Sequence, residues 1–146
     1  MKPVAIFHPV LALVLVTFVV WVAMLVRRGV RMREAGIKPQ DMPTRQLADI
    51  KFGDAQIPNN NLMNLFELPV LFYASSGLVF VLSLVDPLYI TLGWAYVALR
   101  AVQSVVALTY NSVLHRGIAY LISCVVLWAI WLRLAWQIVI DGRGAP

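Results

Sequence analysis

The sequence predicts an all-α integral membrane protein, built as a four-helix up-down bundle. Of its 146 residues, 61% are hydrophobic and only 13% are charged, a balance that excludes an ordinary soluble domain. The apolar residues fall into four blocks, each near the ~20 residues that a helix needs to cross a bilayer. The connections between the later blocks are short, so neighbouring helices must run antiparallel. The whole chain, residues 1–146, is expected to form one transmembrane domain.

The predicted elements follow in a simple order. Four helices are expected at about 7–26, 62–85, 88–110 and 117–140, with a polar loop over 27–59. The first block is too long for the apolar core of a secretory signal and is followed by arginines, so it should be retained as a helix. The third block begins after Asp86-Pro87, because proline has no N–H with which to continue the preceding helix. All four blocks are too continuously apolar for the strands of a membrane barrel.

The long polar loop contains several glycines and prolines, so a single long helix is not predicted there. Its first residues should extend the first helix into the headgroup region. The segment 44–52 forms either a short surface helix or a loop lying on the membrane.

The basic residues predict how the chain is oriented. Eight of them fall in the first and third connections: Arg27, Arg28, Arg31, Arg33, Lys38, Arg45, Lys51 and Arg116. Only Lys2 and Arg143 lie near the ends of the chain. The positive-inside rule therefore places these two connections in the cytoplasm, and both termini on the other side. The net charge of +5 indicates topology and attraction to anionic lipid; without a basic and aromatic surface, nucleic acid is not an expected partner.

Polar side chains interrupt the second apolar block. Asn60, Asn64 and Glu67 follow i, i+4, i+7 spacing, which places them on one helical face. A carboxylate at the bilayer centre costs about 2.5–3.5 kcal/mol on insertion scales, so a chain that keeps one there uses it to bind, relay or pair. Pro69 follows closely and permits a kink beside Glu67.

The third block carries a second intramembrane charge, Arg100, which shares a face with Gln103 and with Tyr110. Because the second and third helices are antiparallel neighbours, Arg100 should reach the depth of Glu67, in its own bundle or in a neighbouring subunit. Two interpretations are open: a structural ion pair that fixes helix register or holds subunits together, or a polar pocket opening to the cytoplasmic interface. Such a pocket would have a mouth lined by Asn59, Asn60, Asn61, Asn64, Tyr110, Asn111, His115 and Arg116.

These groups suit a small zwitterionic or anionic ligand better than a metal. The two histidines, His8 and His115, are predicted on opposite membrane faces and neither joins a carboxylate cluster, so no metal site is predicted.

The same residues resemble a known family. The run Asn64-x-x-Glu67-x-Pro69 early in the second helix is similar to the signature of the MAPEG family, the membrane-associated proteins in eicosanoid and glutathione metabolism. The third-helix run Arg100-Ala-Val-Gln-Ser104, then Leu108-Thr-Tyr-Asn111 and Arg116, also resembles it. So does the plan of four helices with a long first cytoplasmic loop.

The resemblance implies a homotrimer that binds glutathione between neighbouring subunits near the cytoplasmic interface. It implies that Arg116 stabilises the glutathione thiolate, and that Asn64, Glu67 and Arg100 bind the tripeptide or hold its site. By position, Asn60, Gln103 and Tyr110 join them as candidate binding residues. A cation beside a thiol lowers the thiol pKa and raises the thiolate fraction, which makes this chemistry reasonable.

The chain departs from the eicosanoid-metabolising members at two positions. Asn60 stands where those members have an arginine, and Ala107 stands where they tend to have a tyrosine, with Tyr110 displaced. The chain is therefore more similar to the bacterial branch of the family, which implies a bacterial inner membrane.

Three functions follow as hypotheses. The first is a glutathione-dependent transferase or peroxidase acting on lipophilic electrophiles or hydroperoxides. The alternative is a non-enzymatic membrane subunit that uses the same scaffold to pack against other membrane proteins in a larger complex. A proton or ion path through Glu67 is the third, although no second acidic residue lies deep in any predicted helix.

Overall fold

The structure is a computed structural model that describes residues 2–140 and 142. Within these residues it contains six α-helices: α1 (Phe7–Ala35), α2 (Arg45–Phe52), α3 (Ile57–Glu67), α4 (Pro69–Val81), α5 (Pro87–Leu108) and α6 (Val113–Val139). Short 3-10 helices cover Pro3–Ile6, Pro39–Asp41 and Gly53–Gln56. Arg143, one of the terminal basic residues that predict the orientation, lies outside the described residues.

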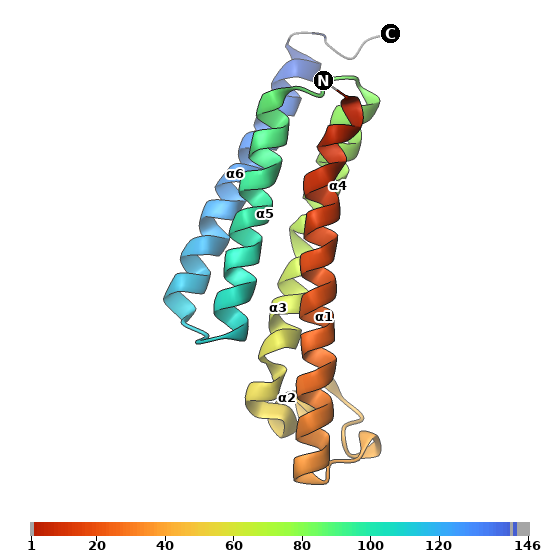
Figure 1. The fold of residues 1–146 in the computed structure, drawn as a ribbon, viewed down its shortest axis with the longest axis vertical. Coiled ribbons are helices and arrows are strands. Elements are labelled where there is room, and N and C mark those ends of the chain that lie inside the picture. The colour runs from red at the N-terminus through yellow and green to blue at the C-terminus, as the bar shows by residue number, and fades with distance from the viewer. Residues whose placement is uncertain (1, 141, 143–146) are drawn as a thin grey trace.

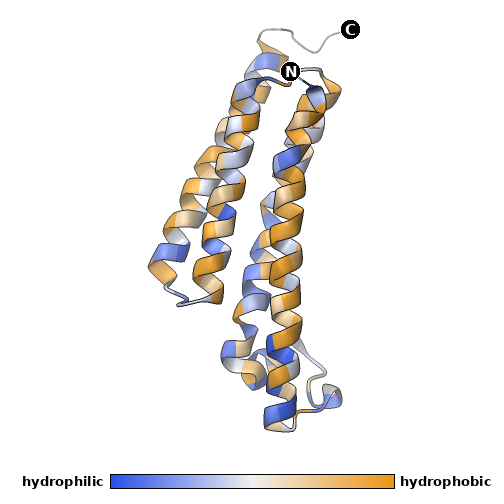
Figure 2. Ribbon diagram, viewed as in Figure 1, coloured by the Kyte–Doolittle hydropathy of each residue, from blue (hydrophilic) through white to orange (hydrophobic). Residues whose placement is uncertain are grey.

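Four helical stretches among the described residues are long and apolar enough to cross a membrane: Pro3–Ala35, Gln46–Val81, Pro87–Leu108 and Val113–Val139. The prediction of an all-helical chain with four long apolar helices is thereby confirmed. Only between 22% and 44% of the residues in their most apolar windows are buried inside the chain. Most residues of these windows are therefore not buried inside the chain, and Figure 2 shows hydrophobic residues along the length of α1 and α6. The chain is a multi-pass membrane protein.

The four membrane spans are arranged as two neighbouring pairs (Figure 1). In one pair α5 and α6 run side by side. In the other, α1 packs along the span that is made of α3 and α4. Contacts between α1 and α5 join the two pairs. The N-terminal end of α1 and the last turn of α6 lie at the same end of the bundle, called here the terminal end. At the opposite end, called the α2 end, α1, α2 and the start of α3 project beyond the α5–α6 turn.

The interior is packed with large side chains from all four spans. Leu13, Phe72, Tyr96 and Leu127 are at most 1% exposed, and the rings of Phe72 and Tyr96 lie 4.8 Å apart. Gly93 lies against α1, where a Cβ added to it would be 3.0 Å from Cγ of Pro9. A side chain at position 93 would therefore require the Pro9 ring to shift by a few tenths of an ångström.

The second span is divided at Leu68. Pro69 cannot donate a backbone hydrogen bond, so α3 ends at Glu67 and α4 begins at Pro69. Leu68 keeps helical backbone angles, φ −65° and ψ −32°, so the chain continues in one direction through the break. The break therefore lies directly after the one carboxylate that the sequence places deep in this span.

The ends of the first two spans lie at local backbone turns. The first helix continues past its apolar block to Ala35, where Gly36 adopts the left-handed conformation (φ 60°) that closes it. The segment 44–52, for which either a surface helix or a loop was expected, contains the helix Arg45–Phe52. The second span begins at Ile57, before the expected start near residue 62, and α4 stops at Val81, before the expected end near residue 85. Ser83 turns the chain there with φ 57°, a local feature that hydropathy alone does not report.

Candidate functional site

A polar pocket opens beside the α5–α6 turn. Its volume is about 230 Å³, and it is lined by Asn64, Gln103, Val113, Arg116, Gly117 and Tyr120. The residues come from α3, α5 and the first turns of α6, so three spans converge there. On α6 the lining positions follow i, i+3, i+4, i+7 spacing, which is one helical face. Of the residues predicted from sequence, the structure brings together Asn64, Gln103 and Arg116 here.

Arg116 is held at the pocket wall by the turn that precedes α6. Its Nη1 donates a hydrogen bond of 2.7 Å to Oδ1 of Asn111. Asn111 adopts a left-handed backbone (φ 48°), which asparagine tolerates better than most residues, and its N–H closes α5 by donating to the carbonyl of Val106. Because a guanidinium has several donors, Arg116 keeps others available toward the pocket.

Arg100 lies behind the pocket and is wholly buried, with 0% exposure. Its Nε donates to the hydroxyl of Tyr96 at 3.2 Å, and its Nη1 donates to Oε1 of Gln103 at 3.0 Å. The guanidinium also lies over the rings of Tyr96 and Tyr120, at 5.2 Å and 4.9 Å from their centroids. Arg100 thereby fixes the carboxamide of Gln103, whose side chain lines the pocket.

This cation has no carboxylate partner among the described residues. Its Nη2 makes no hydrogen bond there, and the expected ion pair with Glu67 inside one bundle does not form. Glu67 is exposed on the surface of the chain, whereas Arg100 is buried inside it. The two charges therefore do not pair within one chain.

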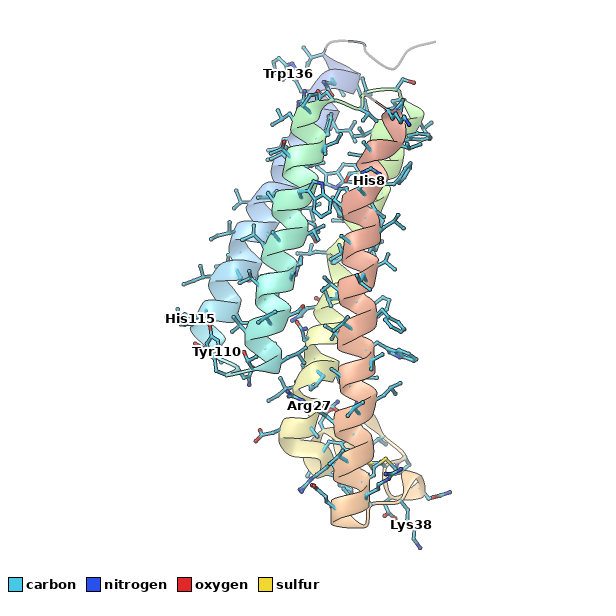
Figure 3. All side chains as sticks on the ribbon, viewed as in Figure 1. His8, Arg27, Lys38, Tyr110, His115 and Trp136 are labelled. Carbon is cyan, nitrogen blue, oxygen red and sulfur yellow. The ribbon has the colours of Figure 1, made fainter. Side chains whose placement is uncertain are left out.

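Asn60 and Tyr110 do not line the pocket. Asn60 is exposed on α3, one turn before Asn64. Tyr110 is 61% exposed, and its hydroxyl lies 3.1 Å from Nδ1 of His115 (Figure 3). The Tyr110 and His115 side chains cap the outside of the α5–α6 turn.

Three lining residues were not singled out by sequence reasoning: Val113, Gly117 and Tyr120. All three lie on α6 within one turn of Arg116, and their spacing from Arg116 was the available signal. Their residue types alone do not indicate a binding site.

Asn61 was expected at the mouth of the pocket, but it is a buried residue of α3. It is 1% exposed, and neither of its amide atoms has a hydrogen-bond partner in the described chain. It is a buried amide that a ligand or a neighbouring chain could satisfy.

Metal binding has no support in the described residues, where no three histidine, cysteine, aspartate or glutamate side chains gather. His8 lies near the terminal end and His115 at the α5–α6 turn (Figure 3).

The terminal end carries a separate polar cluster. Asp86 receives two hydrogen bonds from the guanidinium of Arg133, one of them at 2.9 Å, and accepts another from the N–H of Tyr89. Arg133 lies 4.3 Å from the ring centroid of Tyr89, whose hydroxyl donates to Gln137 at 2.6 Å. The cluster joins the start of α5 to the last turns of α6.

The fold and the pocket define a class: a four-span helical membrane protein with a cationic, amide-lined pocket near one membrane surface. A comparison with protein families matches the MAPEG family over residues 6–136. The chain therefore belongs to the MAPEG family. Comparisons with curated proteins and with solved structures found no match.

Proposed function

We propose that this protein is a membrane-embedded, glutathione-dependent transferase or peroxidase that acts on lipophilic electrophiles or hydroperoxides. The observation that carries the proposal is the tethered guanidinium of Arg116 beside the amides of Asn64 and Gln103 in one pocket. Membership of a family that commonly binds glutathione supports it.

The chemistry of the pocket fits glutathione. The tripeptide carries two carboxylates, amide groups and a thiol, which match amide donors and a guanidinium. The Asn64 and Gln103 side chains would hold its polar groups, and Arg100 would act as a positioning residue through Gln103. The pocket volume of about 230 Å³ is below the ~300–1,000 Å³ usual for ligand sites, so a neighbouring chain is expected to complete it.

Arg116 would supply the electrostatic part of the reaction. Glutathione, when bound, provides a thiol that reacts as its thiolate. A guanidinium near a thiol favours the charged form and so lowers the thiol pKa.

An assembly of identical chains follows from the exposed polar face of α3. Asn60 and Glu67 are exposed in a single chain although they belong to an apolar span. Leaving a carboxylate against lipid is costly, by about 2.5–3.5 kcal/mol at the bilayer centre, and a second copy over this face would remove that cost. We infer a homotrimer, with the α2 end in the cytoplasm of a bacterial inner membrane.

The direct test is glutathione binding and turnover by the detergent-solubilised protein. Wild type should bind glutathione and conjugate it to a generic aryl halide, and Arg116→Ala should reduce conjugation by at least about 100-fold, the loss typical of one electrostatic group in a transition state. Arg33→Ala, which removes an exposed arginine of α1 that lines no pocket described above, is the matched control. Wild-type protein with neither binding nor turnover would rule the proposal out.

The second candidate is a non-enzymatic subunit of a larger membrane complex. Asn60, which stands where related enzymes have an arginine, favours it. Co-purification with other membrane proteins, together with no glutathione binding by that complex, would select this candidate.

A further inference from the structure

Two adjoining cavities lie at the α2 end, at the foot of α1, and share no lining residue with the pocket around Arg116. The larger, of about 420 Å³, is lined by Arg31, Phe52, Gly53, Asp54 and Ala55. The other, of about 310 Å³, is lined by Val26, Arg27, Val30, Arg31, Glu34, Asp54 and Ala55. Because Arg31, Asp54 and Ala55 border both, the two form one hollow, called here the α1 foot cavity.

A contact of Arg27 sets the depth of this cavity. Its guanidinium donates a hydrogen bond to the carbonyl of Leu108, the last residue of α5, so Arg27 lies level with the end of a membrane span. Arg31 and Glu34 follow about 6 Å and 10 Å further along α1, at 1.5 Å per residue. The headgroup layer is roughly 5–8 Å thick on each side of the hydrocarbon core. The two arginines of the α1 foot cavity therefore lie at headgroup depth, and Glu34 lies just outside it.

The cavity carries both signs of charge. Arg27 and Arg31 supply two cations, and Glu34 and Asp54 supply two carboxylates. In the described part of the chain, Glu34, Asp54 and Arg31 form no ion pair with one another or with another residue. A purely anionic headgroup would meet two repelling carboxylates, whereas a headgroup with a phosphate and a primary ammonium would pair with both signs.

An apolar track connects the cavity to the membrane interior. It consists of outward side chains on one face of α1, each between 37% and 62% exposed: Leu15, Val19, Val22, Val26 and Val30. Their spacing of i, i+4, i+7, i+11 and i+15 keeps them in one row. An apolar groove of about 220 Å³ between α1 and α5 includes Leu15 and Val19, the two residues of this row that lie farthest from the cavity. An acyl chain fits such a track, and its headgroup would then reach the cavity.

We propose that the α1 foot cavity binds an amine-bearing zwitterionic phospholipid. Its phosphate pairs with Arg27 and Arg31, and its ammonium pairs with Glu34 and Asp54. One acyl chain follows the apolar track of α1. The site is separate from the pocket around Arg116 and does not depend on the proposed function.

Native mass spectrometry can test the site on the intact protein. The probe is an equimolar mixture of dioleoyl phosphatidylethanolamine, phosphatidylglycerol and phosphatidylcholine in detergent. Phosphatidylethanolamine should be retained over both others, because phosphatidylglycerol lacks the cation and the choline headgroup has no N–H to donate. Arg31→Gln should lower its retention about tenfold, the loss of one charge-assisted hydrogen bond.

Two further variants make the test decisive. Glu34→Gln should shift the preference toward phosphatidylglycerol, while Arg33→Gln, which removes an exposed arginine of α1 that lines neither cavity, should leave retention unchanged. Three results would overturn the proposal: a wild-type preference for phosphatidylglycerol, no selective retention of any lipid, or equal losses in the Arg31 and Arg33 variants. Glutathione binding measured on the same samples reports separately on the other pocket.

Discussion

Asn111 is the residue that decides where the Arg116 guanidinium lies. Its left-handed backbone ends α5, and its side-chain oxygen accepts from Arg116 at 2.7 Å. An aspartate at this position would keep both features but place a negative charge beside the guanidinium. We therefore expect Asn111→Asp to preserve the fold and to reduce conjugation of glutathione by about tenfold or more, because the cation would be partly neutralised.

Asn111→Gly is the matched control, since it keeps the left-handed conformation and removes only the tether. It should lose less activity than the aspartate variant. Equal activity of wild type and Asn111→Asp would show that Arg116 does not act through its charge.

Gly117 keeps the pocket open. A Cβ added there would meet no atom within 4 Å, although the residue lines the pocket, so a side chain would project into empty space. Gly117→Leu should leave the bundle folded, remove a glycine that costs about 1 kcal/mol in a helix, and block glutathione binding. Gly29→Leu, at an equally open position on α1, controls for the added side chain. Calorimetric binding that is unchanged in Gly117→Leu would place the ligand elsewhere.

At the scale of the helices, Asp86 joins α5 to α6 at the terminal end through its ion pair with Arg133. The hydrogen bonds from Arg133 lower the pKa of the Asp86 carboxyl, against the opposing effect of partial burial. The carboxyl also accepts from the Tyr89 N–H as the N-cap of α5. Asp86→Asn, which keeps the cap but not the ion pair, should cost about 1 kcal/mol, and Asp86→Ala about 1 kcal/mol more.

The effect of this pair should depend on pH. A carboxyl whose pKa is lowered by folding stabilises the protein above its unfolded pKa, about 3.9, and that contribution is lost as the pH falls through the lower folded value. In detergent, the thermal unfolding temperature of wild type should therefore exceed that of Asp86→Asn at neutral pH, and the two should be equal in strong acid. A constant difference across this range would mean that the ion pair contributes nothing.

The helices were predictable because long apolar runs have few alternatives in a membrane. Spacing along one helix also predicted which residues share a face, and Asn64, Gln103 and Arg116 do line one pocket.

Spacing along a helix does not predict which neighbouring helix that face contacts. Asn60 and Glu67 share the face of Asn64 yet remain exposed, and Arg100 turns to Gln103 and Tyr96 within its own helix. The pocket is completed by Tyr120 and Gly117, whose types carry no signal of their own.

For the whole molecule, the exposed polar face of α3 predicts an assembly. Native mass spectrometry should find three chains, and Glu67→Trp should shift the population to single chains by wedging the interface. Val139→Trp, at a position 75% exposed on the last turn of α6, is the control. A wild-type protein that is monomeric while it binds glutathione would contradict the shared pocket.

The proposed role of Arg116 is tested most directly by the pKa of the glutathione thiol when bound. The thiolate can be followed by its ultraviolet absorbance as the pH is raised over wild-type protein and over Arg116→Ala. Wild-type protein should lower the pKa of the bound thiol by at least about one unit from the ~8.5 of a free cysteine thiol, and Arg116→Ala should restore it. A bound thiol that titrates like the free one in wild type, or that stays shifted without Arg116, would contradict it.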